Sequence, residues 1–266
     1  MKASEKKTLY VMLKKTSAAF LGYDSPCFEA EPDFFDDDDA PVLGRGLAVE
    51  KQIDGGVKIN FQSQDALQEQ KQDFVFCATI ESIAKKIAMC KRCPLCGQRK
   101  NVVPGEGNPS PLVLVIGEGP GEEEDESGRP FVGPAGRLLD KMLGAIALSR
   151  NKNCFISNIV KCRPPHNRDP EKQEAAACRS FLDAQIHVLK PKMILAMGRV
   201  ALQNILDTSI GINKMRGKFV DFKGIPFMPT YHPSALLRDE SLKRPAWEDL
   251  KAFRQKLLEL APDYDK

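Results

Sequence analysis

The stretch LVLVIGEGPGEEED, residues 112–125, joins a short apolar run to a loop rich in glycine and acidic side chains. Its first part, 112–116, has the length of one buried β-strand. The glycines that follow permit the tight turn by which such a strand leads into the next element. Apolar runs that end in glycine-rich or polar loops recur along the chain, and this pattern predicts the fold.

Amphipathic stretches separate the apolar runs. We predict strands over 112–116, 154–159, 193–197 and 225–228, and helices over 135–148, 170–189, 200–206 and 247–260. A further helical period lies just before them, at 80–88. Strands that alternate with helices are typical of a parallel sheet covered on both faces. The predicted fold is therefore α/β, a three-layer αβα arrangement around a central, mainly parallel four-stranded sheet.

Charge is divided unevenly along the 266 residues, although the whole chain has a net charge of only +3. Residues 1–78 hold nine basic and fourteen acidic side chains, and residues 79–266 hold thirty and twenty-two. We predict an acidic, largely disordered or loosely packed N-terminal extension over 1–78 and a folded domain over 79–266. The extension is either a solvated tail without specific function or a regulatory, partner-binding segment. The folded domain, at +8, is suited to an anionic partner.

Membrane insertion is not expected. The longest apolar run of the first segment, 9–13, is far shorter than the roughly 20 residues of a membrane span. The basic start is not followed by the apolar region and cleavage site of a signal peptide. The sequence therefore predicts an intracellular, cytoplasmic protein.

Ligand sites of parallel sheets form beyond the carboxyl ends of the strands. Polar or glycine-rich loops follow three of the predicted strands, at 117–136, 161–170 and 231–238. The first loop lacks the Gly-Lys-Ser/Thr of a P-loop, and Glu122 stands near where a dinucleotide motif needs its third glycine. Its acidic run would repel phosphate, which favours a neutral ligand or a carboxylate that acts on water or on a developing cation. The alternative is a tight turn with a solvated acidic face.

Eight cysteines without a secretory signal indicate reduced thiols or a metal site. Cys90, Cys93 and Cys96 form a CxxCxxC motif, and Cys162 lies in a polar loop sixteen residues before Cys178. Such spacing suits zinc and iron–sulfur centres about equally. The others are expected to be inert: Cys27, Cys77 and Cys154.

Four motifs together resemble the family 4 uracil-DNA glycosylases, the iron–sulfur branch of the uracil-DNA glycosylase superfamily. They are GEGPGEEED (117–125), GRPFVGPAG (128–136), NIVKCRPPHNRDP (158–170) and HPSALLR (232–238). The match runs in order from about Ala88 to Leu258 and leaves 1–78 outside. The resemblance implies a monomeric, monofunctional DNA glycosylase of base-excision repair. It would hydrolyse the N-glycosidic bond of deoxyuridine in single- or double-stranded DNA and leave an abasic site.

The resemblance also implies a structural [4Fe–4S] cluster held by Cys90, Cys93, Cys162 and Cys178. Cys96 is an additional thiol that could replace one of the close pair. The cluster would fix the loop between Cys162 and Cys178, beside the DNA-facing surface.

A uracil pocket is implied by the same motifs, since a glycosylase reads its flipped base by stacking and by hydrogen bonds. Phe131 matches the stacking residue, although an aromatic side chain is often simply part of a core. Asn158 offers the donor and acceptor that uracil O4 and N3–H require. Backbone contacts are implied for Gly117, Glu118 and Gly119.

Catalysis must stabilise a departing uracil and direct water to the sugar. His232 matches the residue that hydrogen-bonds the O2 oxyanion. Glu124 is expected to orient water or stabilise the sugar cation, and Asn167 to position that water or the base. His166 is expected to be an exposed loop residue.

Basic side chains around these loops are expected to hold DNA phosphates, unless they are ordinary solvated charges. Leu236 is expected to enter the minor groove as a wedge. The predicted phosphate contacts are Arg129, Lys161, Arg163, Arg168 and Arg238.

Two other functions remain open from the sequence. One is a module of the same fold that binds uracil-containing DNA, or attaches to it covalently, without turnover. The covalent branch has a basic insertion near the HNR loop, which is absent from 166–168. The other is a zinc-dependent nucleotide or DNA hydrolase built on the cysteines.

Overall fold

The computed structural model describes residues 79–265, so the extension predicted over 1–78 lies outside the described residues. The strands are β1 (Glu106–Gly107), β2 (Val113–Gly117), β3 (Cys154–Asn158), β4 (Met193–Met197), β5 (Val220–Phe222) and β6 (Ile225–Thr230). The α-helices are α2 (Ile80–Ala88), α3 (Glu122–Ser127), α4 (Pro134–Gly144), α5 (Lys172–Leu189), α6 (Gly198–Leu206), α7 (Ile212–Met215), α8 (Pro233–Arg238) and α9 (Lys243–Leu260). Short 3₁₀ turns are η3 (Pro94–Gly97), η4 (Pro165–Asn167) and η5 (Glu240–Leu242).

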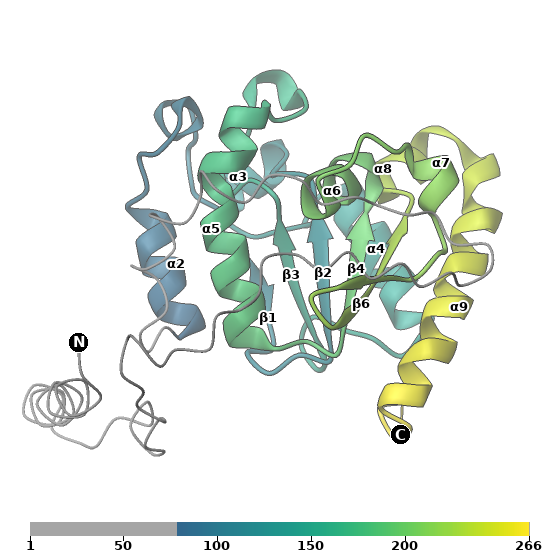
Figure 1. The fold of residues 1–266 in the computed structure, drawn as a ribbon. Helices are drawn as coiled ribbons and strands as arrows, with labels where there is room; N and C mark the ends of the chain where they lie inside the picture. The colour runs from purple at the N-terminus through teal and green to yellow at the C-terminus, as the bar shows by residue number, and fades with distance from the viewer. Residues whose placement is uncertain (1–78, 266) are drawn as a thin grey trace, which may run out of the picture. The chain divides into compact units, whose positions relative to one another are not determined.

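The strands form one six-stranded sheet in the order β1-β3-β2-β4-β6-β5 (Figure 1). Its four central strands are parallel, which confirms the predicted α/β class and the parallel centre of the sheet. The sheet is wider than the four strands expected, because β1 and β5 add an antiparallel strand at each edge. These strands have two and three residues, too few to show a period in the sequence.

Helices cover both faces of the sheet, which confirms the three-layer arrangement (Figure 1). On one face, α4, α8 and α9 pack against alternate residues of the central strands, and Leu139, Leu236 and Phe253 belong to this core. Helices α5 and α6 lie on the opposite face (Figure 1). Every residue of β2, β3 and β4 is buried, as expected where a strand is covered twice.

Strand register brings the polar residues after the strands to one edge. Gly117 pairs with Asn158 across β2 and β3, and Met197 pairs with Thr230 across β4 and β6. The residues that follow each strand therefore gather along the carboxyl edge. Part of the predicted glycine loop is helical there: α3 begins after Gly121, and its acidic first turn suits the positive end of a helix.

None of the helices in the described part of the chain is long and apolar enough to cross a membrane.

Candidate active site

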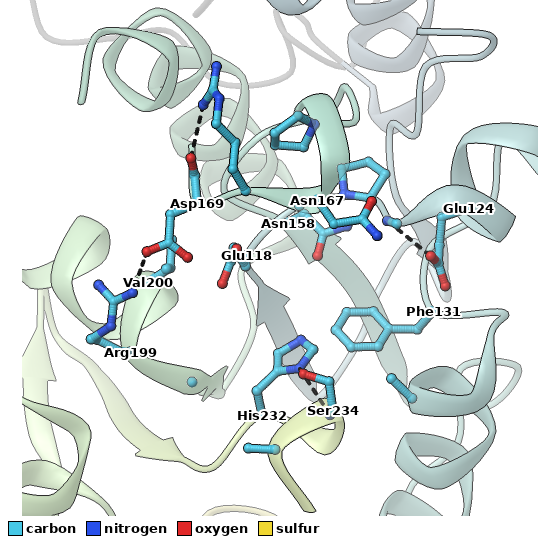
Figure 2. Close-up of a pocket in the computed structure, with 18 of the residues that line it drawn as sticks. Glu118, Glu124, Phe131, Asn158, Asn167, Asp169, Arg199, Val200, His232 and Ser234 are labelled. Carbon is cyan, nitrogen blue, oxygen red and sulfur yellow. Dashed lines mark hydrogen bonds and ion pairs between the residues drawn. The ribbon is translucent and has the colours of Figure 1, made fainter. Parts of the chain in front are cut away.

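A cavity of about 540 Å³ opens at the carboxyl edge of the sheet. Figure 2 shows side chains from the β2, β3 and β6 loops pointing into it. The predicted site residues that line it are Glu118, Gly119, Glu124, Phe131, Asn158, Asn167, Arg168, His232 and Arg238. Residues of all four motifs, which are spread over 117–238, therefore meet in one cavity.

Asn158 ends β3 and is 1% exposed. Its Oδ1 has no hydrogen-bond partner, although it is buried. An unpaired buried acceptor costs free energy, and it is retained where a ligand supplies the missing donor. Asn158 Oδ1 is therefore free to accept a hydrogen bond from a molecule in the cavity, and its predicted role in base binding stays a prediction.

Gly117 leaves the space that this amide needs. A Cβ atom at Gly117 would press on Asn158 Oδ1 and lie 2.5 Å from Phe131 Cζ. The loop beside it is held by backbone bonds, since the N–H groups of Ile159 and Val160 donate to the carbonyls of Gly117 and Glu118. Only glycine fits between the amide and the aromatic ring.

Phe131 is held in a left-handed backbone conformation, with φ of 52°. The buried guanidinium of Arg150 donates to the carbonyls of Pro130 and Phe131 at 2.9 and 2.8 Å, and it also pairs with Asp140. The ring of Phe131 lies 5.5 Å from that of His232, measured between centroids. Phe131 thus forms one wall of the cavity, in a geometry that it would not adopt without these bonds.

His232 is the N-cap of α8, and its Nδ1 accepts the backbone N–H of Ser234 at 3.2 Å. This bond places the proton of a neutral ring on Nε2. Burial, together with the positive charge of Arg238, lowers the pKa of His232 to about 4, and the carboxylate of Glu124 opposes this shift. The cavity is therefore lined by a neutral imidazole that can donate from Nε2.

Glu124 joins two loops through its carboxylate. Oε2 accepts the Gly121 N–H at 3.0 Å, and Oε1 accepts the N–H groups of Val132 and Gly133 at 2.9 and 3.1 Å. These three bonds fix the glycine loop against the loop that carries Phe131. The geometry favours a positioning role for Glu124, while its predicted role toward water stays a prediction.

Glu118 presents its side chain to the cavity, not only its backbone (Figure 2). Burial and the neighbouring carboxylate of Asp169 together raise the pKa of Glu118 to about 7. Arg199 and Arg238 oppose this rise, and Arg199 forms an ion pair with Asp169. Glu118 is therefore a carboxyl group that changes its charge near neutral pH.

The remaining predicted polar residues have partners within the protein. Asn167 is exposed at the rim, where its Oδ1 accepts Arg163 Nε at 2.8 Å, and His166 is exposed as expected. Arg168 pairs with Glu174 at 2.7 Å, and Arg129 pairs with Glu106 at 2.6 Å. Arg168 lines the cavity, whereas Arg129 and Arg163 are not among its lining residues. The contacts of all three with DNA stay predictions.

Two predicted DNA contacts are contradicted by burial. Lys161 is 1% exposed and its ammonium group is bonded inside the protein, so it does not reach a phosphate. Leu236 is 2% exposed and packs in the core on the inner side of α8. The exposed residue of this helix is Leu237, at 48%. A wedge on α8 would therefore be Leu237.

The five cysteines of the predicted metal region line one small second cavity: Cys90, Cys93, Cys96, Cys162 and Cys178. Arg99 donates to Cys162 Sγ at 3.0 Å and to the carbonyls of Ala88 and Cys90. Burial raises the pKa of the Cys178 thiol to about 11. Within residues 79–265, no three ligand side chains converge as a single metal ion requires.

Sequence reasoning missed Arg150 and the pair Asp169–Arg199. Arg150 carried no signal, because its partners are formed by tertiary contacts about twenty residues away in the chain. Arg199 did carry one: it is the second residue after β4, the one predicted strand for which the following residues were not considered as part of a site.

Comparison with known proteins gives consistent matches. A family model described as the uracil DNA glycosylase superfamily matches residues 104–251. The type-4 uracil-DNA glycosylase of Sulfurisphaera tokodaii is 43% identical over 185 residues, which cover 66% of this chain and 84% of that protein. The type-4 uracil-DNA glycosylase of Thermotoga maritima is 46% identical over 176 residues, which cover 65% of this chain and 91% of that protein. A type-5 uracil-DNA glycosylase of Pyrobaculum aerophilum is 28% identical over 189 residues, covering 59% and 83%.

Glu118 should make stability depend on pH. Its pKa is about 7 in the folded protein and near 4.5 when unfolded, so the folded state binds more protons between these values. The free energy of unfolding therefore falls as pH rises from about 4.5 to 7, by about 2 kcal/mol once residual solvent contact is allowed for. Glu118→Gln removes this dependence. Denaturant titrations of the wild type and of Glu118→Gln at several pH values measure the free energy of unfolding. An equal dependence of this free energy on pH in the two proteins would contradict the prediction.

Proposed function

Because the chain belongs to the type-4 uracil-DNA glycosylases within the uracil-DNA glycosylase superfamily, we propose that the cavity at the carboxyl edge binds a flipped uracil and is where its N-glycosidic bond is hydrolysed. The protein is a DNA glycosylase, a hydrolase of base-excision repair. The observation that carries the assignment of the site is the unpaired Oδ1 of Asn158 inside the cavity.

Recognition of the base rests on complementary hydrogen bonds. Asn158 Oδ1 accepts the N3–H of uracil, and its amide nitrogen donates to O4. Cytosine presents an acceptor at position 3 and a donor at position 4, so both contacts would be unpaired. Phe131 stacks on the base, and the backbone of Glu118 and Gly119, which also line the cavity, contacts it.

Hydrolysis breaks the bond between C1′ and N1, and the electron pair leaves with uracil. His232 donates from Nε2 to the developing negative charge on O2 while the ring stays neutral. A water oxygen then bonds to C1′ and loses its proton. Asn167 positions this water, and Glu118, a half-buried carboxylate that lines the cavity, receives the proton in its ionised form. Glu124 holds the two loops of the cavity wall together.

Asn158→Ala tests the assignment. Loss of both base contacts should lower uracil release from uracil-containing DNA by at least about 100-fold. Asn151→Ala, an exposed asparagine outside the cavity, is the matched control and should keep normal activity. Full-length protein is assayed on single- and double-stranded DNA, with abasic sites counted. Normal activity of Asn158→Ala would refute the recognition role, and a wild-type protein that binds without releasing uracil would be a binding module.

Gly117→Ala should abolish activity through one methyl group. The added Cβ would collide with Asn158 and with Phe131, so the base could no longer enter between them. We expect a loss of about 100-fold or more in kcat/KM. Gly144→Ala, at the end of α4 with no atom within 4 Å of its added Cβ, should be fully active. Equal activities of the two variants would show that the base does not bind between Asn158 and Phe131.

The cysteine cavity is suited to the [4Fe–4S] cluster of this branch. Four thiolates around a four-iron core lie further apart than the ligands of one ion, in keeping with thiols that share a cavity without converging on a point. Cys90, Cys93, Cys162 and Cys178 would hold it, and Arg99 would stabilise the Cys162 thiolate. When bound, the cluster would tie the segment between α2 and η3 to the loop after β3 and to α5.

Iron and sulfide analysis tests the cluster. The purified protein should contain about four irons per chain and absorb broadly in the visible range. Cys162→Ser should lose most of this iron, whereas Cys96→Ser should keep it. Loss of iron in Cys96→Ser, with iron retained in Cys93→Ser, would show that Cys96 is the ligand in place of Cys93. Colourless protein that contains zinc would refute the cluster.

The remaining assignments extend this function. Arg168, Arg238, Arg163 and Arg129 are the proposed phosphate contacts around the cavity. Residues 79–266 are proposed as the catalytic domain of a monomer, in line with relatives that cover 65–66% of the chain. The chain would act inside the cell, where its DNA substrate is found.

A further inference from the structure

Lys161 is a buried cation placed just behind the base-recognising strand end. Its Nζ donates to Ser157 Oγ at 2.6 Å, to the backbone carbonyl of Asn158 at 2.7 Å and to Gln185 Oε1 at 2.9 Å. All three acceptors are neutral. Removing an ammonium group from water is costly, so a nearby negative charge is what would keep it charged in this position.

The other side of Lys161 faces the cysteine cavity. Lys161 lines that cavity together with Cys162 and Cys178. Four thiolates carry more negative charge than a four-iron core carries positive charge, so an occupied cavity is anionic overall. Lys161 therefore joins the cysteine cavity to the backbone of Asn158.

Neighbouring bonds make this link rigid. Ser157 Oγ donates to Gln185 Oε1 at 2.8 Å, and Gln185 Nε2 donates to the carbonyl of Pro104 at 2.6 Å. The backbone carbonyl of Lys161 accepts the N–H of Val103 at 2.8 Å. The ammonium group is thus fixed from β3, from α5 and from the segment before β1, and a change in its position would move Asn158.

We propose that Lys161 is a positioning residue that couples the charge of the [4Fe–4S] cluster to the orientation of Asn158. This inference rests on the proposed function, in which the second cavity holds the cluster. The anionic cluster holds the ammonium group in its buried place, and the ammonium group holds the carbonyl of Asn158. The amide of Asn158 then faces the base with Oδ1 unpaired. The cluster would in this way act on base binding without touching the base.

Lys161→Met in the full-length protein tests the coupling, since it keeps the length of the side chain and removes its charge and donors. Free uracil serves as a product inhibitor, because its inhibition constant reports the pocket and not the fraction of folded protein. We expect this constant to rise about tenfold, as for loss of one hydrogen bond from a charged group. Ferricyanide should also bleach the visible absorbance about threefold faster, because a cluster without a neighbouring positive charge is easier to oxidise.

Arg92→Met is the matched control. Arg92 lines the same cavity from its exposed side and donates to Ser180 Oγ at 2.8 Å. Its removal takes a positive charge from the cavity but should leave the uracil inhibition constant within about twofold of the wild type, because solvent screens an exposed charge. An unchanged constant in Lys161→Met, or an equal rise in both variants, would overturn the proposal.

Ser157→Ala is the second variant, in case Lys161→Met does not fold. It keeps the charge of Lys161 and removes one acceptor, so the inhibition constant should rise about threefold, and an unchanged constant would again overturn the proposal. Wild-type protein that releases uracil without containing iron would refute the cluster and with it the coupling. Wild-type protein that releases no uracil would refute the proposed glycosylase function. Failure of the coupling and failure of the proposed function therefore give different results.

Discussion

One unsatisfied amide oxygen is the constraint on which the site depends. Asn158 Oδ1 is buried at the end of a central strand, where no protein group donates to it. A parallel sheet makes this arrangement possible, because the register places a glycine, Gly117, directly across from it. Under the proposed function, the free energy lost by leaving this oxygen unpaired would be returned when a base with a matching N–H enters.

The loops around this amide are held by bonds to backbone groups. Glu124 gathers three N–H groups from two loops, and Arg150 binds two consecutive carbonyls at Pro130 and Phe131. Bonds of this kind fix the path of the backbone, so that the ring of Phe131 forms one wall of the cavity. The site is therefore rigid before its ligand arrives, which reduces the ordering that binding would otherwise require.

Much of the fold and part of the site could be predicted from the sequence because their signals are local. Continuous apolar runs predicted the central strands, and the rule that ligands gather beyond strand ends pointed to Asn158 and His232. The resemblance added the chemistry. Lys161 and Leu236 were misassigned because a motif shows the order of residues along the chain but not whether a side chain points to solvent or into the core. Leu236 is three residues after the buried Pro233, a helical spacing that indicates an inward face.

Other features had no local signal at all. Lys161 is buried because Gln185, on a helix 24 residues away, accepts from it. The raised pKa of Glu118 depends on Asp169 and on burial, neither of which its own motif contains. Such properties arise when distant segments pack together, and so they could be found only in the structure.

The edges of the sheet have a consequence for behaviour at high concentration. An open strand edge offers free N–H and C=O groups to another chain, and long edges promote aggregation. Here the outer strands are the two-residue β1 and the three-residue β5, while the longer strands β2, β3, β4 and β6 lie inside the sheet. The folded domain thus exposes little backbone that a neighbouring molecule could extend into a shared sheet.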